Sequence, residues 1–196
     1  MPYAPAHPSR GRLRNRIPGQ PLHILLLMLY ISYERKSPAM AYDARQIANW
    51  FIARAAKDGR VMSIMWLLKL VYIAHGWRLE TQDAPLFRNR IEAWRYGPVI
   101  PDIYNVFRKQ GIKVSRPAKG EGWTDILPRD ENLLEQVYEI YGKLSALRLS
   151  NLTHVAGGPW DIAMKTGGAY APIPDELIKL HYVMKRAKAE ERRANV

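Results

Sequence analysis

Three histidines in the body of the chain are the first candidates for chemistry, because imidazole can bind a metal ion or transfer a proton. His75, His154 and His181 lie far apart, and none belongs to a closely spaced pair such as H-x-x-x-H. A metal-dependent hydrolase would need these three side chains to converge, together with Asp161 or Asp175. A lone histidine on an apolar helix face is usually a hydrogen-bonded core residue. The sequence therefore predicts no metal site and no other cofactor.

The remaining catalytic patterns are also missing from the sequence. The glycine pairs Gly157-Gly158 and Gly167-Gly168 match neither G-x-x-x-x-G-K-[ST] nor G-x-G-x-x-G, and turn formation explains them better. There is no G-x-S-x-G nucleophile motif. Cysteine is absent, which excludes disulfides and thiolate chemistry and fits a reducing cytoplasm. We expect a cytoplasmic protein that is not an enzyme.

The formal net charge of +12 favours an anionic partner, such as a nucleic acid, an acidic protein face or anionic lipid. Residues 1–40 hold six basic side chains against only Glu34, and residues 186–196 form a charged tail with both signs. The middle of the chain is therefore less basic than the total suggests. Solvated basic termini account for most of the charge, and nucleic-acid binding remains the alternative.

Residues 1–40 are rich in Pro, Arg and Gly at their start and are interpreted as a disordered or mis-annotated N-terminal extension. The apolar run at residues 22–31 is shorter than the roughly 20 residues that span a membrane, so no membrane association is expected. Three interpretations of this region remain open. It imitates a secretory signal, it precedes a true start at Met40, or residues 22–33 form an extra helix that packs on the domain or a partner.

The positions of apolar residues predict a helix at Asp43 to Lys57, capped by Asp43, and a second helix from Ser63 to about Thr81. Between Ile64 and Trp77, the second helix has Lys69 as its only charged residue. A helix that is apolar nearly all round lies at the centre of a bundle. Gly76 within it predicts close approach by another element.

A short strand is predicted at Ile91 to Tyr96, ended by a rigid turn at Gly97-Pro98, with a second strand at Ile112 to Ser115 beside it. Five further helices are predicted: Asp102–Gln110, Asp130–Leu144 capped by Asp130, a pair opened by Ser150 and Pro159, and a last helix capped by Asp175 with Leu177, Leu180, Val183 and Met184 on one face. The fold class is thus mainly α, a compact helical bundle of about five to seven helices with a small antiparallel β-hairpin.

Aromatic residues suggest a binding surface. Trp94 and Tyr96 alternate along the predicted strand, so one face would carry both rings, next to the constrained Pro98. Trp and Tyr dominate the energetically important positions of protein interfaces. Packing in the core is the competing interpretation of the same residues.

Several stretches resemble one family. Residues 69–77 (KLVYIAHGW), 85–87 (PLF) and 91–99 (IEAWRYGPV) resemble the Panacea domain of SocA-like antitoxins and phage-associated GepA-like proteins. Residues 102–107 (DIYNVF) and the later segments 149–154 and 158–160 continue the pattern. The resemblance spans about Ala41 to Met184, and we place the domain at residues 41–185.

The resemblance implies a mainly α-helical domain that neutralises a cognate protein toxin by direct contact. In some family members the antitoxin also acts as a proteolytic adaptor that delivers the toxin to the ClpXP protease. A nucleic-acid-binding or phage-associated regulatory protein is the alternative function. The residues that we expect to bind the partner are Trp94, Tyr96, Pro98, Tyr104 and Trp160.

Overall fold

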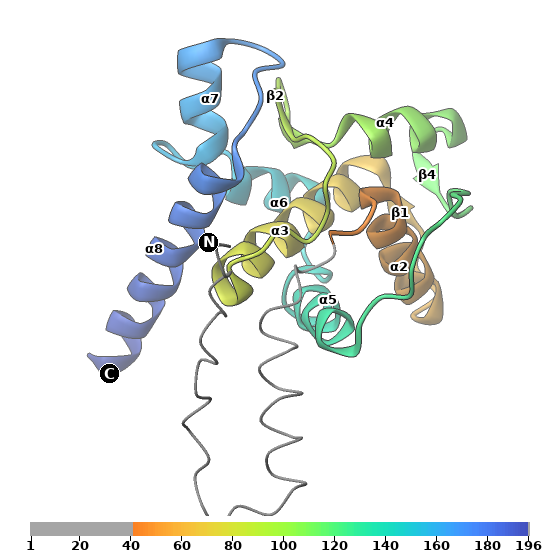
Figure 1. Ribbon diagram of the computed structural model, residues 1–196, viewed down its shortest axis with the longest axis horizontal. Helices are drawn as coiled ribbons and strands as arrows, with labels where there is room; N and C mark the ends of the chain where they lie inside the picture. The colour runs from red at the N-terminus through yellow and green to blue at the C-terminus, as the bar shows by residue number, and fades with distance from the viewer. Residues whose placement is uncertain (1–40, 196) are drawn as a thin grey trace, which may run out of the picture. The chain divides into compact units, whose positions relative to one another are not determined.

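The computed structural model describes residues 41–195. The predictions for residues 1–40 lie outside this range. The described part is mainly α-helical with two small antiparallel sheets, which confirms the predicted fold class (Figure 1). The helices are α2 Ala44–Lys57, α3 Ile64–Gln82, α4 Pro101–Phe107, α5 Pro128–Tyr141, α6 Ala146–Thr153, α7 Pro159–Gly167 and α8 Asp175–Ala194; a 3-10 turn covers Arg108–Gln110; the strands are β1 Met62–Ser63, β2 Glu92–Trp94, β3 Gly97–Val99 and β4 Lys113–Val114.

Helix α3 lies at the centre of the bundle, in contact with α2, α5, α6 and α8. It begins as predicted, because the Ser63 hydroxyl accepts a hydrogen bond from the Trp66 backbone amide. Leu67, Leu70 and Val71 are completely buried. Burial on all sides explains why its sequence is apolar nearly all round. Within residues 41–195, no helix combines the length and hydrophobicity needed to cross a membrane.

Gly76 is the point at which α8 crosses α3. A Cβ atom added at Gly76 would fall inside van der Waals contact with the ring of Tyr182. Tyr182 is buried and packs edge-on against Trp77, with ring centroids 5.0 Å apart. The predicted close approach at Gly76 is confirmed, and the approaching element is α8.

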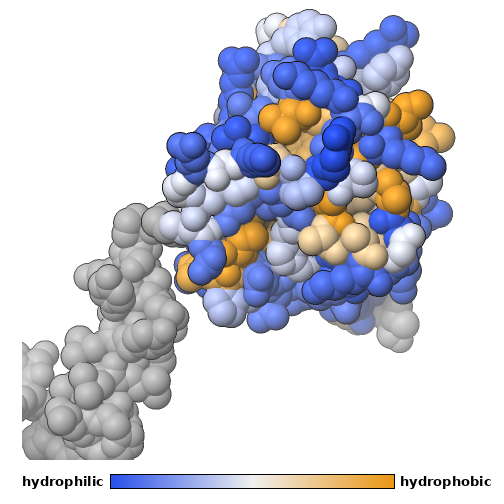
Figure 2. Space-filling view, turned by 90° about the vertical axis from the view of Figure 1, so that its right-hand side faces the viewer, coloured by the Kyte–Doolittle hydropathy of each residue, from blue (hydrophilic) through white to orange (hydrophobic). Residues whose placement is uncertain are grey.

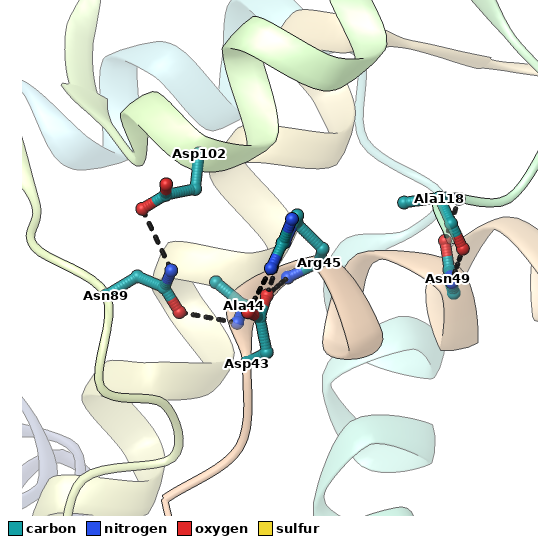
Figure 3. Close-up of polar contacts among 7 residues, drawn as sticks. All are labelled: Asp43, Ala44, Arg45, Asn49, Asn89, Asp102 and Ala118. Carbon is teal, nitrogen blue, oxygen red and sulfur yellow. Dashed lines mark hydrogen bonds and ion pairs between the residues drawn. The ribbon is translucent and has the colours of Figure 1, made fainter. Parts of the chain in front are cut away.

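Two polar side chains near α2 connect segments that are distant in sequence (Figure 3). The side-chain oxygen of Asn89 accepts a hydrogen bond of 2.7 Å from the backbone amide of Ala44 at the start of α2. The side-chain NH2 group of Asn89 donates a hydrogen bond of 2.8 Å to the carboxylate of Asp102 in α4. Asn49 pairs with the backbone of Ala118 through two hydrogen bonds of 2.9 and 2.7 Å. These contacts hold two irregular loops against α2.

Three predicted helix caps are wrong in the same way. The helix containing Asp130 begins at Pro128, and Asp130 lies completely buried within its first turn. Helix α6 is capped by Ser145, so Ser150 lies inside the helix. Asp175 is the first residue of α8 and not its cap. In α5 the first helical position is taken by Pro128, to which proline is well suited. Each of the three polar side chains makes a tertiary contact instead of capping its helix.

The predicted pairing of the strands is also wrong. The chain turns back at Arg95 and Tyr96, so β2 pairs with β3 and Trp94 lies opposite Gly97. Gly97-Pro98 therefore belongs to a strand and not to a turn, and Tyr96 lies in the turn and not beside Trp94 on a strand. The expected second strand at 112–115 pairs instead with β1, with Met62 opposite Val114.

The apolar face predicted on α8 is not the face that packs against the bundle. Ile178 and Tyr182 are the buried side chains of this helix. Leu180, Val183 and Met184 are exposed, because α8 contacts α3 along only one narrow stripe. The helix continues through most of the predicted charged tail and ends at Ala194. An apolar face of α8 is thus left uncovered within the described residues.

Candidate functional site

The β2–β3 hairpin forms the centre of the candidate site. Residues 170–173, between α7 and α8, run along the other side of β2. The amide of Ala93 donates to the carbonyl of Ala171, and the Ala93 carbonyl accepts from the Tyr170 amide, both at 2.8 Å. The Ile173 amide donates to Ile91, also at 2.8 Å. Strand β2 is therefore held on both edges, which fixes the position of its side chains.

Lys69 supports the hairpin from the core. Its Nζ atom donates a hydrogen bond of 3.0 Å to the carbonyl oxygen of Pro98, and its side chain is completely buried. Burial lowers the pKa of Lys69 to about 7. A Cβ atom at Gly97 would lie 2.6 Å from Lys69 Nζ and 2.8 Å from the His154 ring. With a φ of +100°, this position suits only glycine.

Helices α6 and α7 hold the hairpin turn through its carbonyl groups. The Ser150 hydroxyl donates to the Tyr96 carbonyl at 3.2 Å, and Trp160 Nε1 donates to the Trp94 carbonyl at 2.8 Å. The His154 ring packs on Trp160 with centroids 4.1 Å apart. His154 Nδ1 lies 2.6 Å from the Ser150 carbonyl and must carry the proton, since a carbonyl can only accept.

Trp94 is the centre of an aromatic cluster on the hairpin. Its ring packs edge-on against Tyr104 of α4 at 4.9 Å and against Tyr170 at 5.3 Å. Its Nε1 atom donates to Glu92 at 2.8 Å, and Arg90 pairs with the same carboxylate at 2.9 Å. Each edge-on aromatic pair contributes about 0.5–1.5 kcal/mol beyond its buried area. These contacts fix the Trp94 ring while leaving it half-buried.

Two tyrosines of the site are open to solvent. Tyr96 is 60% exposed and Tyr170 is 64% exposed. The Arg95 guanidinium lies 5.4 Å from the Tyr96 ring. Tyr170 has a φ of +68°, a left-handed conformation that is costly for a residue with a side chain and concentrates at functional positions. We call Trp94, Arg95, Tyr96, Tyr104 and Tyr170 the hairpin surface.

Of the five expected partner-binding residues, some are accessible at the hairpin surface and others support the hairpin. Trp94 and Tyr104 contact each other, and Trp160 supports the backbone beneath Trp94. Tyr96 is exposed at the turn. Pro98 is buried, and its carbonyl accepts from Lys69.

Sequence reasoning missed four residues of this site: Lys69, Ser150, His154 and Tyr170. Lys69 gave a usable signal, because it is a lone charge in an apolar helix. Ser150 was interpreted as a helix cap and His154 as a core residue. Nothing in the sequence around Tyr170 indicates that it lies beside Trp94.

The three histidines of the described chain lie in different surroundings. His75 is buried and pairs with Asp175 through Nε2 at 3.0 Å. His154 supports the hairpin, and His181 lies on α8, where burial and the charge of Lys185 lower its pKa. Across residues 41–195, no three histidine or acidic side chains are grouped as metal ligands would be. The polar atoms of the site fix backbone and rings in place, which is suited to recognition.

Comparison with known proteins finds a matching family and a relative of this chain. The sequence pattern of the family described as "Antitoxin SocA-like, Panacea domain" matches residues 67–161. The matched range contains Lys69, the hairpin, His154 and Trp160, whereas Tyr170 lies beyond it. Antitoxin SocA of Caulobacter vibrioides (strain NA1000 / CB15N) is 37% identical over 134 residues, which cover 61% of this chain and 69% of that protein. No solved structure matches the chain significantly. The chain belongs to the family of SocA-like antitoxins with a Panacea domain.

Proposed function

We propose that this protein is an antitoxin that neutralises a cognate protein toxin by direct binding, and that the hairpin surface makes the contact. The exposed Tyr96 at the hairpin turn and the exposed Tyr170 on the segment beside β2 carry this proposal, because β2 is held on both edges. Tyr, Trp and Arg are the residues that most often provide binding energy at interfaces. The relative named antitoxin SocA supports the general role.

The rigid support of the hairpin favours binding, because little conformational freedom is lost when a partner associates with it. Four side chains hold the hairpin backbone or its glycine position: Lys69, Ser150, His154 and Trp160. A surface that is already in its binding conformation avoids a cost of about 0.5–1.5 kcal/mol per side chain ordered.

The charge of the chain limits how neutralisation can work. With a net charge of +12, this protein does not imitate an acidic nucleic acid. Arg95 and Arg108 lie beside the aromatic rings of Tyr96 and Tyr104. A toxin surface with apolar pockets and acidic edges fits these side chains best, so neutralisation would proceed by hydrophobic docking or by holding an inactive toxin conformation.

Surface variants can test this function. Toxin from the adjacent gene would be co-expressed with wild type, Tyr96→Ala and Tyr170→Ala, and complex formation and growth would be measured. Loss of both with intact folding is expected. Ile112→Ala and Leu147→Ala are the controls, because these exposed apolar residues lie outside the hairpin surface. A harmless adjacent product, or equal rescue by all four variants, would contradict the proposal.

An adaptor role for ClpXP is a finer proposal, favoured by a second exposed apolar region along α8 that would leave the hairpin free for toxin. Toxin degradation by purified ClpXP with and without this protein would test it. Unchanged toxin lifetime would refute the adaptor role without affecting neutralisation.

Nucleic-acid binding remains the alternative because of the net charge. However, Arg186 of α8 is paired with Glu80 at 2.5 Å, and Lys179 is paired with Asp83. DNA binding that weakens steeply with salt and survives in a chain without residues 1–40 would favour the alternative. No binding at low salt would exclude it.

A further inference from the structure

The segment that runs from the end of α4 through β4 carries an unbalanced positive charge. Residues 103–120 contain five basic side chains and no acidic one. The first of these, Arg108, lies beside Tyr104 of the hairpin surface. The other four are exposed, and none of them forms an ion pair with an acidic side chain of residues 41–195. We define the basic surface by these four residues, which are Lys109, Lys113, Arg116 and Lys119.

The backbone that carries the basic surface is anchored at three points. The Gln110 side chain makes three hydrogen bonds with the backbone of residues 115–116, at 2.7, 3.2 and 3.0 Å. Val114 is buried in the β1–β4 sheet. The Asn49 side chain holds the backbone of Ala118 (Figure 3). Because the backbone is fixed, less conformational freedom is lost when these cations bind a partner.

The composition of the basic surface favours phosphate over a protein partner. The end of the molecule that carries α4 and β4, on the right of Figure 1, faces the viewer in Figure 2, where hydrophilic side chains surround separate apolar patches. Within residues 103–120, Ile112 is the one large apolar side chain that is exposed. Protein interfaces have an apolar centre and are depleted in lysine. Three lysines and one arginine instead suit the phosphate groups of a nucleic acid.

The position of the aromatic residues favours a duplex over a single strand. Proteins bind single strands by stacking the bases on accessible aromatic rings. Among the described residues, the exposed aromatic side chains are Tyr96 and Tyr170, and both belong to the hairpin surface. Trp123, which follows the basic surface in the sequence, is half-buried beside Gly120. The basic surface therefore offers charge without a stacking platform, which fits the dense row of phosphates on duplex DNA.

We propose that the basic surface binds the phosphate backbone of double-stranded DNA. This binding adds a second activity to the proposed antitoxin function and does not depend on the contact with toxin. Phosphate contacts carry no sequence information, so duplexes of unrelated sequence bind equally well. The dissociation constant expected for such binding is about 10⁻⁶ to 10⁻⁴ M at physiological salt.

The dependence of binding on salt provides the test. Fluorescence anisotropy would follow the full-length chain as it binds a fluorescein-labelled DNA duplex at 50 to 200 mM NaCl. Four phosphate contacts predict a slope of about −3.6 for the logarithm of the binding constant against the logarithm of salt concentration. The affinity should therefore fall about 100-fold over this range. A second duplex of unrelated sequence should give the same result.

Two double variants locate the binding. Lys113→Gln/Lys119→Gln should reduce the slope to about −1.8 and weaken binding at least about tenfold at 50 mM NaCl. Arg12→Gln/Arg14→Gln is the matched control, because it removes the same charge from a part of the sequence outside the basic surface. This control should keep the slope of wild type. Circular dichroism and thermal unfolding would confirm that both variants fold.

Several results would overturn the proposal. No binding of the duplex at 50 mM NaCl, equal effects of the two double variants, or equally tight binding of a single strand would each exclude a duplex site on the basic surface. Poly-glutamate and phosphatidylserine vesicles would serve as competitors at matched charge. If either displaces the labelled duplex as effectively as unlabelled duplex does, the basic surface is assigned to an acidic protein or to a lipid surface instead.

Discussion

Lys69 Nζ, in the middle of α3, donates a hydrogen bond of 3.0 Å to the carbonyl oxygen of Pro98 in β3. This contact joins the most buried helix to the hairpin whose surface we propose as the toxin contact. It uses a titratable group that is completely buried. Burial favours the neutral amine, so the support of the hairpin is coupled to the protonation state of Lys69.

The stability of the protein should therefore rise with pH above neutrality. The pKa of Lys69 is about 7 in the folded state against 10.5 as the ordinary value. Between these values the unfolded chain binds a proton that the native state lacks, so raising the pH stabilises the native state. The slope approaches about 1.4 kcal/mol per pH unit, and below pH 7 the full cost of protonating Lys69 is present.

Urea unfolding of wild type and Lys69→Met at pH 7 to 9.5 would measure this effect. Higher pH is avoided because buried tyrosines titrate there, and burial raises the pKa of Tyr42 to about 12. The variant should lose the slope. Parallel pH profiles for the two proteins would show that Lys69 does not titrate in this range.

Gly97→Ala should destabilise the hairpin. The added methyl group would meet Lys69 Nζ and the His154 ring at 2.6 and 2.8 Å, and the left-handed φ adds strain. The expected loss is about 2–4 kcal/mol, from overpacking and backbone strain together. Gly111→Ala is the control, because Gly111 also has a positive φ but has no atom within 4 Å of the added carbon. Similar losses of unfolding free energy in both variants would mean that strain alone acts at Gly97.

The central helix was predictable because its signals are local. An apolar stretch without interruption, a serine cap and one internal glycine predicted α3 and its crossing at Gly76. The pairing of β4 with β1 was not predictable, because these two-residue strands have no pattern of their own and meet only after the helices pack. The cap assigned to Asp130 failed because its partner, Arg78, is 52 residues away in the sequence.

The candidate site was predictable only in part. Residue type alone indicated Trp94, Tyr104 and Trp160, since large aromatics serve either a core or an interface. The support from His154 and the position of Tyr170 depend on how α6, α7 and the following segment pack on the hairpin. Such contacts arise from tertiary structure, and a single sequence carries no local signal for them.

Asp130→Ala should be the most destabilising of these substitutions. Asp130 is completely buried, pairs with the buried Arg78 and accepts a hydrogen bond of 2.8 Å from the Tyr42 hydroxyl. Its removal leaves an unpaired guanidinium in the core, at a cost of about 3–5 kcal/mol. Urea unfolding would measure the loss.

The double variant Arg78→Met/Asp130→Leu separates the pair from the buried charge. It should be more stable than Asp130→Ala, because no charge remains without a partner. Lys165→Ala, which removes only an exposed ion pair with Asp161, should have little effect. An Asp130→Ala protein as stable as Lys165→Ala would contradict the assigned role.

Gly76→Ala should loosen the packing of α8 on α3. The methyl group would overlap the Tyr182 ring, and overpacking of this kind costs about 1–3 kcal/mol. Tyr182→Leu should destabilise alone, yet the double variant Gly76→Ala/Tyr182→Leu should lose less than the sum of the single variants. Additive losses in chemical denaturation would show that Gly76 and Tyr182 do not oppose each other directly.

Tyr170→Gly separates stability from binding at the hairpin surface. Glycine tolerates the φ of +68°, so the variant relieves backbone strain while losing the ring contact with Trp94. These effects are each about 1 kcal/mol and opposite in sign, so the free energy of unfolding should change little. Toxin binding should weaken at least about tenfold, because the lost ring is exposed and available to a partner.

Tyr170→Asn completes this test, since asparagine also tolerates the left-handed conformation but keeps a polar side chain. Both variants should fold like wild type in urea unfolding and bind toxin weakly in isothermal titration calorimetry. If both instead lose stability and retain affinity for toxin, Tyr170 is a packing residue, and its strained backbone serves only to place residues 170–173 against β2. Full affinity with unchanged stability would remove Tyr170 from the hairpin surface altogether.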